Sequence, residues 1–130
     1  RESVLDGVPK SLPGLLRGRR IQEKAAGVGF DWDKKEQVLL KVDEEICELK
    51  EAILKNNGIE DELGDVFFSL INLSRHLKIN PESSLKKSIE KFSKRFKKIE
   101  KYLKRKNIRM KDLTLNELDE LWEKNKKNNL

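Results

Sequence analysis

The chain has 130 residues, the length of one compact domain, and 40% of them are charged against 36% that are hydrophobic. Its 29 basic and 23 acidic residues give a net charge of +6, and this mixture of signs favours helices with solvated faces over a disordered chain. A single cysteine and a single histidine exclude an intrachain disulfide, a cysteine-rich zinc site and a histidine-based metal cluster within one chain.

Helical periodicity runs through most of the sequence and predicts an all-α fold, a bundle of about five helices. Residues 1–13 hold Gly7, Pro9 and Pro13, so we expect an extended arm or linker there, ahead of a single domain over residues 14–130. The expected helices cover residues 14–28, 34–55, 59–77 and 81–105, and a fifth begins after Thr114.

Local signals support these helix limits. Residues 56–58 read Asn-Asn-Gly, which ends the second helix and is short enough to make the second and third helices antiparallel neighbours. Three residue pairs are typical of helix N-termini: Asp33 with Glu36, Asn80 with Pro81, and Thr114 with Glu117.

Apolar spacing predicts which helix faces are packed. The second helix carries one apolar stripe, and the fourth carries a coiled-coil-like seam. The third is apolar around most of its circumference, so we expect it to be buried on several sides. We expect Cys47 to be a small packing residue. The stripe consists of Val38, Val42, Ile46, Leu49 and Ile53, and the seam of Leu85, Ile89, Phe92, Phe96, Ile99 and Leu103.

Two acidic motifs lie on the second and third helices. Glu45 and Glu48 are three residues apart at the flank of the apolar stripe, and Glu62 and Asp65 have the same spacing on the third helix. Unpaired carboxylates on a buried helix are costly, so four that converge need a cation between them. A polar stripe continues from the second pair through Ser69, Asn72 and His76, the last expected to be a hydrogen-bonded structural residue.

Oxygen ligands without histidine or sulfur favour Mg²⁺ or Mn²⁺. Mg²⁺ that is held by a few carboxylates completes its shell with waters and substrate phosphates, so the four acids predict a site for a phosphate-bearing ligand. Each motif alone is more typical of a solvated face in a chain with this much charge. Lys41, on the same flank, and Lys50 would then form only weak surface ion pairs.

The fourth helix is strongly basic, and most of its charges must face water. Lys91 and Arg95 flank the aromatic part of the seam, where they are best placed to clamp phosphate oxygens. Trp122 and Lys126 repeat this spacing in the last helix, and Trp32 lies in a turn where it could stack on a base. The plainer alternatives are that Trp122 is a core or interface residue and that the basic run serves solubility or nonspecific nucleic-acid binding.

Together these motifs resemble the MazG-type nucleoside triphosphate pyrophosphohydrolases of the all-α NTP pyrophosphatase superfamily. Residues 41–49 resemble the EExxE motif of that family and residues 62–68 its ExxD motif. Relatives often have a longer, more charged link at residues 56–58, so no phosphate contact is assigned to that turn. The other matching segments are residues 4–13, 21–26, 28–32, 72–77, 91–96 and 121–122.

The resemblance implies Mg²⁺-dependent hydrolysis of a (d)NTP to a (d)NMP and pyrophosphate by metal-activated water that attacks the α-phosphorus. It implies that Glu45, Glu48, Glu62 and Asp65 are the metal ligands, and that Glu44 or Glu45 is the catalytic group that orients or deprotonates the water. Family members are typically homodimers or higher assemblies, so we expect dimerisation through the bundle. The expected nucleotide-binding residues are Lys41, Lys91, Arg95, Trp122, Lys126 and Trp32.

Two other functions stay open at this point. One is a non-enzymatic dimeric module that binds nucleic acid through the basic helix, although no specific nucleic-acid partner is expected. The other is a narrower pyrophosphatase selective for dCTP or dUTP, whose base preference would depend on the surroundings of Trp32 and Trp122.

The sequence holds no apolar run of about 18 residues and no signal-peptide pattern, so we expect a cytoplasmic protein without a membrane span. The chain begins at Arg1 and its start resembles the link that precedes the C-terminal catalytic domain of two-domain relatives. We therefore expect a domain upstream of Arg1.

Overall fold

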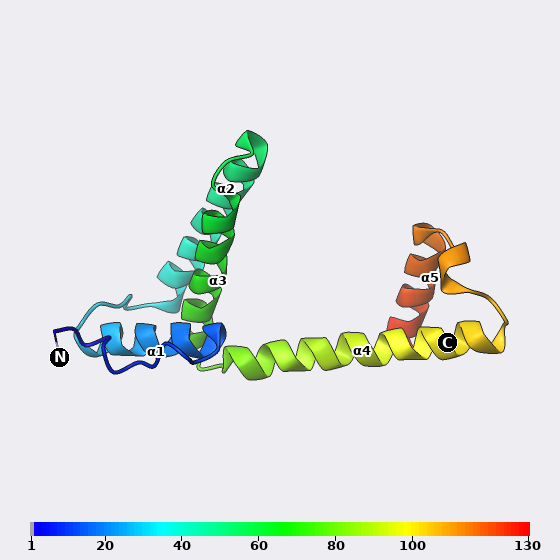
Figure 1. The fold of residues 1–130 in the computed structure, drawn as a ribbon, viewed down its shortest axis with the longest axis horizontal. Helices are drawn as coiled ribbons and strands as arrows, with labels where there is room; N and C mark the ends of the chain where they lie inside the picture. The colour runs from blue at the N-terminus through cyan, green and yellow to red at the C-terminus, as the bar shows by residue number, and fades with distance from the viewer. Residues whose placement is uncertain (1) are drawn as a thin grey trace. The chain divides into compact units, whose positions relative to one another are not determined.

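The computed structural model describes residues 2–130, which form five α-helices and one short 3₁₀ helix and contain no strand (Figure 1). The predicted all-α class is therefore confirmed. The chain divides into two compact units, residues 1–84 and residues 85–130, with the boundary inside α4. The elements are α1 (Gly14–Gly27), α2 (Lys35–Lys55), α3 (Ile59–His76), α4 (Pro81–Arg105), η1 (Met110–Asp112), which was not predicted, and α5 (Leu115–Lys126).

Residues 2–13 form a series of turns, whereas an extended arm was expected. The Asp6 carboxylate accepts hydrogen bonds from the backbone N–H groups of Glu2 and Ser3, at 3.0 and 2.9 Å. Val8 is buried, so this segment packs against the rest of its unit. Arg1, the first residue of the expected arm, lies outside the described residues.

Two of the predicted helix caps form as expected. At α4, the Asn80 Oδ1 atom accepts from the backbone N–H groups of Glu82 and Ser83 at 2.9 and 3.3 Å. At α5, Thr114 and Glu117 exchange side-chain and backbone hydrogen bonds of 3.0 and 3.2 Å. Both caps satisfy N–H groups that the first helical turn leaves without partners.

The predicted cap of α2 is wrong. Asp33 and Glu36 do not form it, because α2 begins at Lys35 and the Gln37 side chain accepts from the backbone N–H of Lys34 at 3.1 Å. The reciprocal hydrogen bond of a capping box is missing, because the lysine side chain of Lys34 has no acceptor for the backbone N–H of Gln37.

In the first unit, α2 and α3 pack side by side as an antiparallel hairpin (Figure 1). The turn between them uses left-handed backbone at Asn56 (φ 51°) and Gly58 (φ 70°), as the Asn-Asn-Gly sequence predicts. The helix α1 packs on α3, where Gly18 permits a close approach. A Cβ atom at Gly18 would lie only 3.0 Å from the Ile71 side chain.

The buried face of α2 departs from the predicted stripe in its second half. Its first two apolar residues are buried as expected, but Glu45 and Ala52 are buried in place of Ile46 and Ile53. Two helices that pack at a shallow angle keep a contact seam with a spacing of about 3.5 residues, so the seam moves from 46 to 45 and from 53 to 52. Glu45 therefore lies on the packed face and not at its flank.

Several apolar residues that were expected to be packed are exposed in the single chain. On α3, the side chains of Phe67 and Phe68 are 54% and 47% exposed, so the expected burial on several sides is wrong for the chain alone. Cys47 is also exposed. In the seam of α4 only Ile99 and Leu103 are buried. Within the described residues, each helix is covered by its neighbours on part of its circumference only.

Among residues 2–130, no helix combines the length with the apolar character needed to cross a lipid bilayer.

Candidate metal centre and adjoining cavity

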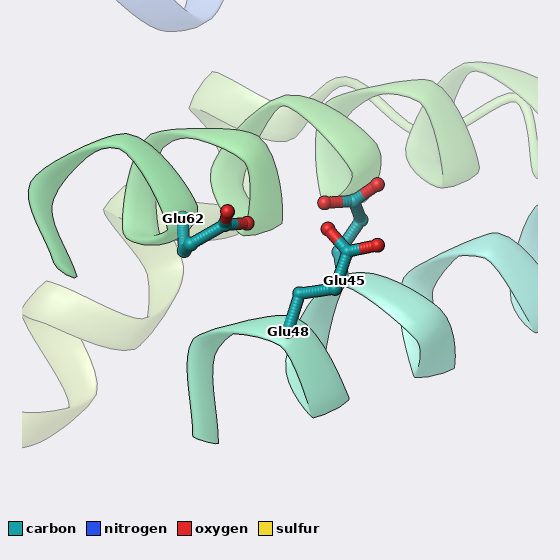
Figure 2. Close-up of side chains that lie close together, drawn as sticks. All are labelled: Glu45, Glu48 and Glu62. Carbon is teal, nitrogen blue, oxygen red and sulfur yellow. The ribbon is translucent and has the colours of Figure 1, made fainter. Parts of the chain in front are cut away.

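Three carboxylates from two helices converge in the first unit. Glu45 and Glu48 project from one face of α2, and Glu62 faces them from α3 (Figure 2). One oxygen atom from each side chain lies within 4.8 Å of the other two. The three-residue spacing places Glu45 and Glu48 on one face of α2, and the packing of α2 against α3 brings Glu62 opposite them. The structure thus brings together three of the four predicted metal ligands.

The cluster is short of positive charge. Partial burial and the nearby charges of Glu48 and Asp65 raise the pKa of the Glu62 carboxyl above its ordinary value of 4.5. The Oε2 atoms of Glu45 and Glu62 are buried without a hydrogen-bond partner. Asp65 is not among the three converging residues, but its charge acts on Glu62 and its side chain lines the adjoining cavity.

Lys41 is the cation that contacts this group of acids. Its Nζ atom lies 3.0 Å from Glu45 and 3.3 Å from Glu44. The two carboxylates, Glu45 foremost, raise the pKa of Lys41 above its ordinary value of 10.5. The ion pairs that the plainer alternative expects for Lys41 are therefore present, and one of them involves the buried Glu45 carboxylate. Lys50, the other lysine of that alternative, forms no ion pair among the described residues.

These residues fit a hard divalent cation. The donors are carboxylate oxygens, the ligands that Mg²⁺ and Mn²⁺ prefer. Oxygens that share one Mg²⁺ ion lie about 3.0 Å apart when adjacent and about 4.2 Å apart when opposite, so the three oxygens, which lie within 4.8 Å of one another, would have to move closer together to share an ion. Such an ion would also satisfy the two buried oxygens that have no hydrogen-bond partner within residues 2–130.

A cavity of about 740 Å³ adjoins the cluster. Its size is in the range of pockets that bind small molecules. Trp32 lines it together with Lys41, Glu45 and Asp65, so this predicted nucleotide-binding residue lies beside the acids. The other lining residues are Ile21, Gln22, Ala25, Gly29, Phe30, Asp31, Phe68, Ser69, Asn72 and Arg75.

A second charged cluster, which the sequence analysis missed, ties the loop between α1 and α2 to the end of α3. Two guanidinium nitrogens of Arg75 donate to the Asp31 carboxylate at 3.0 and 2.6 Å, and His76 Nε2 lies 2.9 Å from it. Arg75 also donates to Asn72 Oδ1 at 2.8 Å. The guanidinium holds the pKa of the Asp31 carboxyl well below its usual range, with a smaller contribution from His76.

One sequence signal for this cluster was available. Arg75 is the single lysine or arginine of α3 and is adjacent in sequence to His76, where the polar stripe of that helix ends, so an acidic partner for it could have been sought. His76 is hydrogen-bonded, as predicted.

The buried side chain of Gln22 on α1 was not predicted either. Its Nε2 atom donates to the Phe68 carbonyl at 2.9 Å, and its Oε1 atom is buried without a hydrogen-bond partner among the described residues. Nothing in the periodicity of α1 distinguishes Gln22 from its polar neighbours.

The remaining predicted residues belong to the second unit. Arg95 lies over the Trp122 ring, 6.0 Å from its centroid, and the Asn125 side chain donates to the Arg95 carbonyl at 2.7 Å. Lys91 and Lys126 are exposed. The structure thus brings Arg95 and Trp122 together, in a half-buried aromatic contact.

Comparisons with known proteins agree with this description. The chain is 47% identical over 126 residues to the nucleoside triphosphate pyrophosphohydrolase/pyrophosphatase MazG of Thermotoga maritima. The aligned residues cover 97% of this chain and 49% of that protein. It is 37% identical over 131 residues to the nucleoside triphosphate pyrophosphohydrolase of Escherichia coli K12, with 98% and 50% covered. The chain therefore spans about half the length of these curated relatives.

A further relative is the uncharacterized protein YabN of Bacillus subtilis, 38% identical over 124 residues that cover 92% of this chain and 25% of that protein. The family model of the MazG nucleotide pyrophosphohydrolase domain matches residues 33–100, just over half of the chain. The matched segment contains α2, α3 and therefore all three converging carboxylates. The chain belongs to the MazG nucleotide pyrophosphohydrolase domain family.

Proposed function

We propose that this domain hydrolyses nucleoside triphosphates to the monophosphate and pyrophosphate with the help of Mg²⁺. The observation that carries the proposal is the convergence of Glu45, Glu48 and Glu62, with oxygens within 4.8 Å of one another. The names of the Thermotoga and Escherichia relatives, both nucleoside triphosphate pyrophosphohydrolases, support the reaction.

In this proposal Glu45, Glu48 and Glu62 hold the cation, and Asp65 is the fourth ligand. A bound divalent cation would supply charge neutralisation for the triphosphate and activate a water for attack on the α-phosphorus. Mg²⁺ is the proposed metal because the donors are all carboxylates, and Mn²⁺ is the closest substitute.

The chain's own cations and aromatic residues bind and orient the substrate. Lys41 is held beside the cluster by Glu45 and Glu44, where a phosphate oxygen can replace one of these partners. Trp32 and the cavity receive the nucleoside part of the substrate. Lys91 and Arg95 are proposed as further phosphate ligands, and Trp122 and Lys126 as further nucleotide-binding residues.

Glu44 and Glu45 differ as candidates for the group that orients the water. Glu45 belongs to the acid cluster, whereas Glu44 is exposed and contacts only Lys41 among the ion pairs of the described residues. A Glu44→Gln variant that keeps its affinity for Mn²⁺ but loses turnover would assign the role to Glu44. Unchanged turnover in that variant would assign it to Glu45.

The test is a panel of ribo- and deoxyribonucleoside triphosphates with Mg²⁺, in which pyrophosphate and orthophosphate are measured separately. We expect pyrophosphate from the wild-type chain and no Mg²⁺-dependent turnover from Glu48→Ala. The matched control is Glu51→Ala, which removes an exposed glutamate of the same helix whose one ion pair in the described part of the chain is with Lys55. Release of orthophosphate, or full activity of Glu48→Ala, would contradict the proposal. Activity confined to dCTP or dUTP would identify the narrower enzyme.

One observation favours a second candidate function. Residues 85–130 contain 16 basic and 7 acidic residues, a net charge of +9, so this unit could bind a polyanion such as nucleic acid. A salt titration of DNA binding distinguishes the two. Tight binding that survives moderate salt would support the nucleic-acid module, whereas loss of binding with a steep salt dependence is typical of nonspecific attraction.

We also propose that the chain forms a homodimer, which the exposed apolar side chains of the hairpin support. Leu40, Leu54 and Phe67 are 64%, 87% and 54% exposed, more apolar surface than a solvated helix pair usually presents. Light scattering coupled to size exclusion should give twice the chain mass, and a monomer at micromolar concentration would contradict this. The cytoplasmic location stays a prediction.

A further inference from the structure

The loop between α1 and α2 carries Trp32 to the cavity, yet little packing holds it there. Trp32 is 45% exposed and Phe30 is 81% exposed. The loop leaves α1 through Gly29, whose φ of 95° is a conformation that side-chain-bearing residues rarely adopt. Its position must therefore depend on specific polar contacts more than on buried apolar area.

The Asp31 carboxylate is the centre of those contacts. Its Oδ1 atom accepts from the backbone N–H of Trp32 at 2.8 Å, so the carboxylate is fixed to the tryptophan's own backbone. The same carboxylate receives the fork of two Arg75 nitrogens and the contact from His76. In the described residues, each hydrogen bond between this loop and α3 ends on Asp31.

The partners of Asp31 are themselves held by α3. Arg75 donates to Asn72, three residues earlier on the same helix, and its side chain is only 16% exposed. A planar guanidinium that makes two parallel bonds to a carboxylate fixes direction as well as distance. The contacts from Arg75 to Asp31, and from Asp31 to the Trp32 backbone, therefore fix the position of Trp32 relative to α3. The same helix carries Glu62 and Asp65.

We propose that Arg75 is a positioning residue, which acts through Asp31 to hold Trp32 in place as a wall of the site for the nucleoside part of the substrate. This inference rests on the proposed function for the identity of the ligand, a nucleoside triphosphate. Arg75 contributes to the affinity for the nucleotide and leaves metal binding and the chemical step unchanged. The nucleoside is the relevant part of the substrate, because Trp32 is aromatic and lines the cavity, whereas the acid cluster is proposed to hold the cation.

The first test needs no activity. Trp122→Phe makes Trp32 the only tryptophan of the chain, so its fluorescence reports on the loop. In that background Arg75→Met should raise acrylamide quenching of Trp32, up to about twofold, because a side chain now 45% exposed becomes fully solvated. Arg75→Lys, which keeps the charge but not the fork, should give a smaller increase. The control Arg19→Met removes an arginine that pairs with Glu23 within α1, and it should change nothing.

The second test is kinetic and uses the otherwise wild-type chain. Arg75→Met should raise the KM for nucleoside triphosphates about tenfold with kcat within about twofold, since a charged, bidentate contact is lost from outside the reacting centre. Asp31→Asn should act in the same direction, and the double variant should be no worse than the poorer single variant, because both remove one interaction. The affinity for Mn²⁺, measured by calorimetry without nucleotide, should stay that of the wild type.

The outcomes separate this inference from the proposed function. Unchanged quenching and unchanged KM in Arg75→Met, with the wild type active, would overturn the role of Arg75 and leave the activity standing. A fall in kcat or in Mn²⁺ affinity at constant KM would also overturn it. If the wild type releases no pyrophosphate, the quenching test still decides whether Arg75 positions Trp32. If Arg75→Met does not fold, Arg75→Lys and Asp31→Asn decide the same question.

Discussion

Two clusters of charge lie beside the same cavity and are built in opposite ways. Glu45, Glu48 and Glu62 are like charges that converge with too few cations, and the pKa of Glu62 is raised. Asp31 and Arg75 are opposite charges that satisfy each other, and the pKa of Asp31 is lowered. Both clusters involve α3, and each has a member at the cavity wall.

The difference shows which charges are available for a ligand. A carboxylate that already has a guanidinium fork has its charge neutralised and serves to fix the structure around it. Carboxylates that crowd together with buried, unpartnered oxygens destabilise the free protein and gain from any cation that joins them. The binding role therefore belongs to the acid cluster, and the positioning role to the Asp31–Arg75 pair.

The largest contrast between the clusters should appear in metal affinity. Glu48→Gln should weaken Mn²⁺ binding by about 100-fold or more, because loss of a ligand costs at least as much as loss of an outer-shell partner. Asp31→Asn should leave the affinity within about threefold, since its carboxylate is engaged by Arg75. Isothermal titration calorimetry measures both. Equal losses in the two variants would show that the clusters do not have separate roles.

The stability of the metal-free protein should change in opposite directions. Glu62→Gln removes one of three repelling charges and should raise Tm in EDTA. Asp31→Asn weakens hydrogen bonds to a charged partner and should lower the free energy of unfolding by about 1–3 kcal/mol. Differential scanning calorimetry measures the pair. Added Mg²⁺ should then raise Tm of the wild type but not of Glu62→Gln, and a gain in both would contradict the metal site.

The pH dependence of stability should also have opposite signs. Asp31 has a lowered pKa, so its stabilisation is present above its ordinary value of 3.8 and is lost as the pH falls below that. Glu62 has a raised pKa, so the metal-free protein loses stability as the pH rises from 4.5 through that raised value. Denaturant titrations between pH 3 and about 7 should show the first slope missing in Asp31→Asn and the second missing in Glu62→Gln.

Salt should have the smallest effect, and it should act on one cluster more than on the other. Glu48 is exposed, so its repulsion of Glu62 should weaken as the Debye length falls from about 10 Å at 0.1 M to about 3 Å at 1 M salt. The Tm gain of Glu62→Gln should shrink accordingly. The deficit of Asp31→Asn should change less, because the Arg75 and Asp31 side chains are only 16% and 25% exposed. If the Tm changes of Glu62→Gln and Asp31→Asn were equally sensitive to salt, the two clusters would not differ in their exposure to solvent.

The all-α class and most of the helix limits follow from local patterns of residues along the chain. The Asn-Asn-Gly turn and the caps at Asn80 and Thr114 are local signals. In each cap a side-chain oxygen accepts from a backbone N–H group only two or three residues away. The spacing of Glu45 and Glu48 and the short turn after α2 also predict that these two acids meet Glu62, because a short link makes consecutive helices antiparallel neighbours.

The burial of each side chain and the contacts between residues far apart in the chain depend instead on how the helices and loops pack together. The shift of the α2 seam that buries Glu45 depends on the angle between two helices, which no single helix encodes. The pair of Asp31 and Arg75 spans 44 residues and joins a loop to a helix end. Residue spacing along one element predicts contacts three or four positions apart. It carries no information on contacts that form when separate elements pack together, because their geometry is set by the whole of the surrounding core.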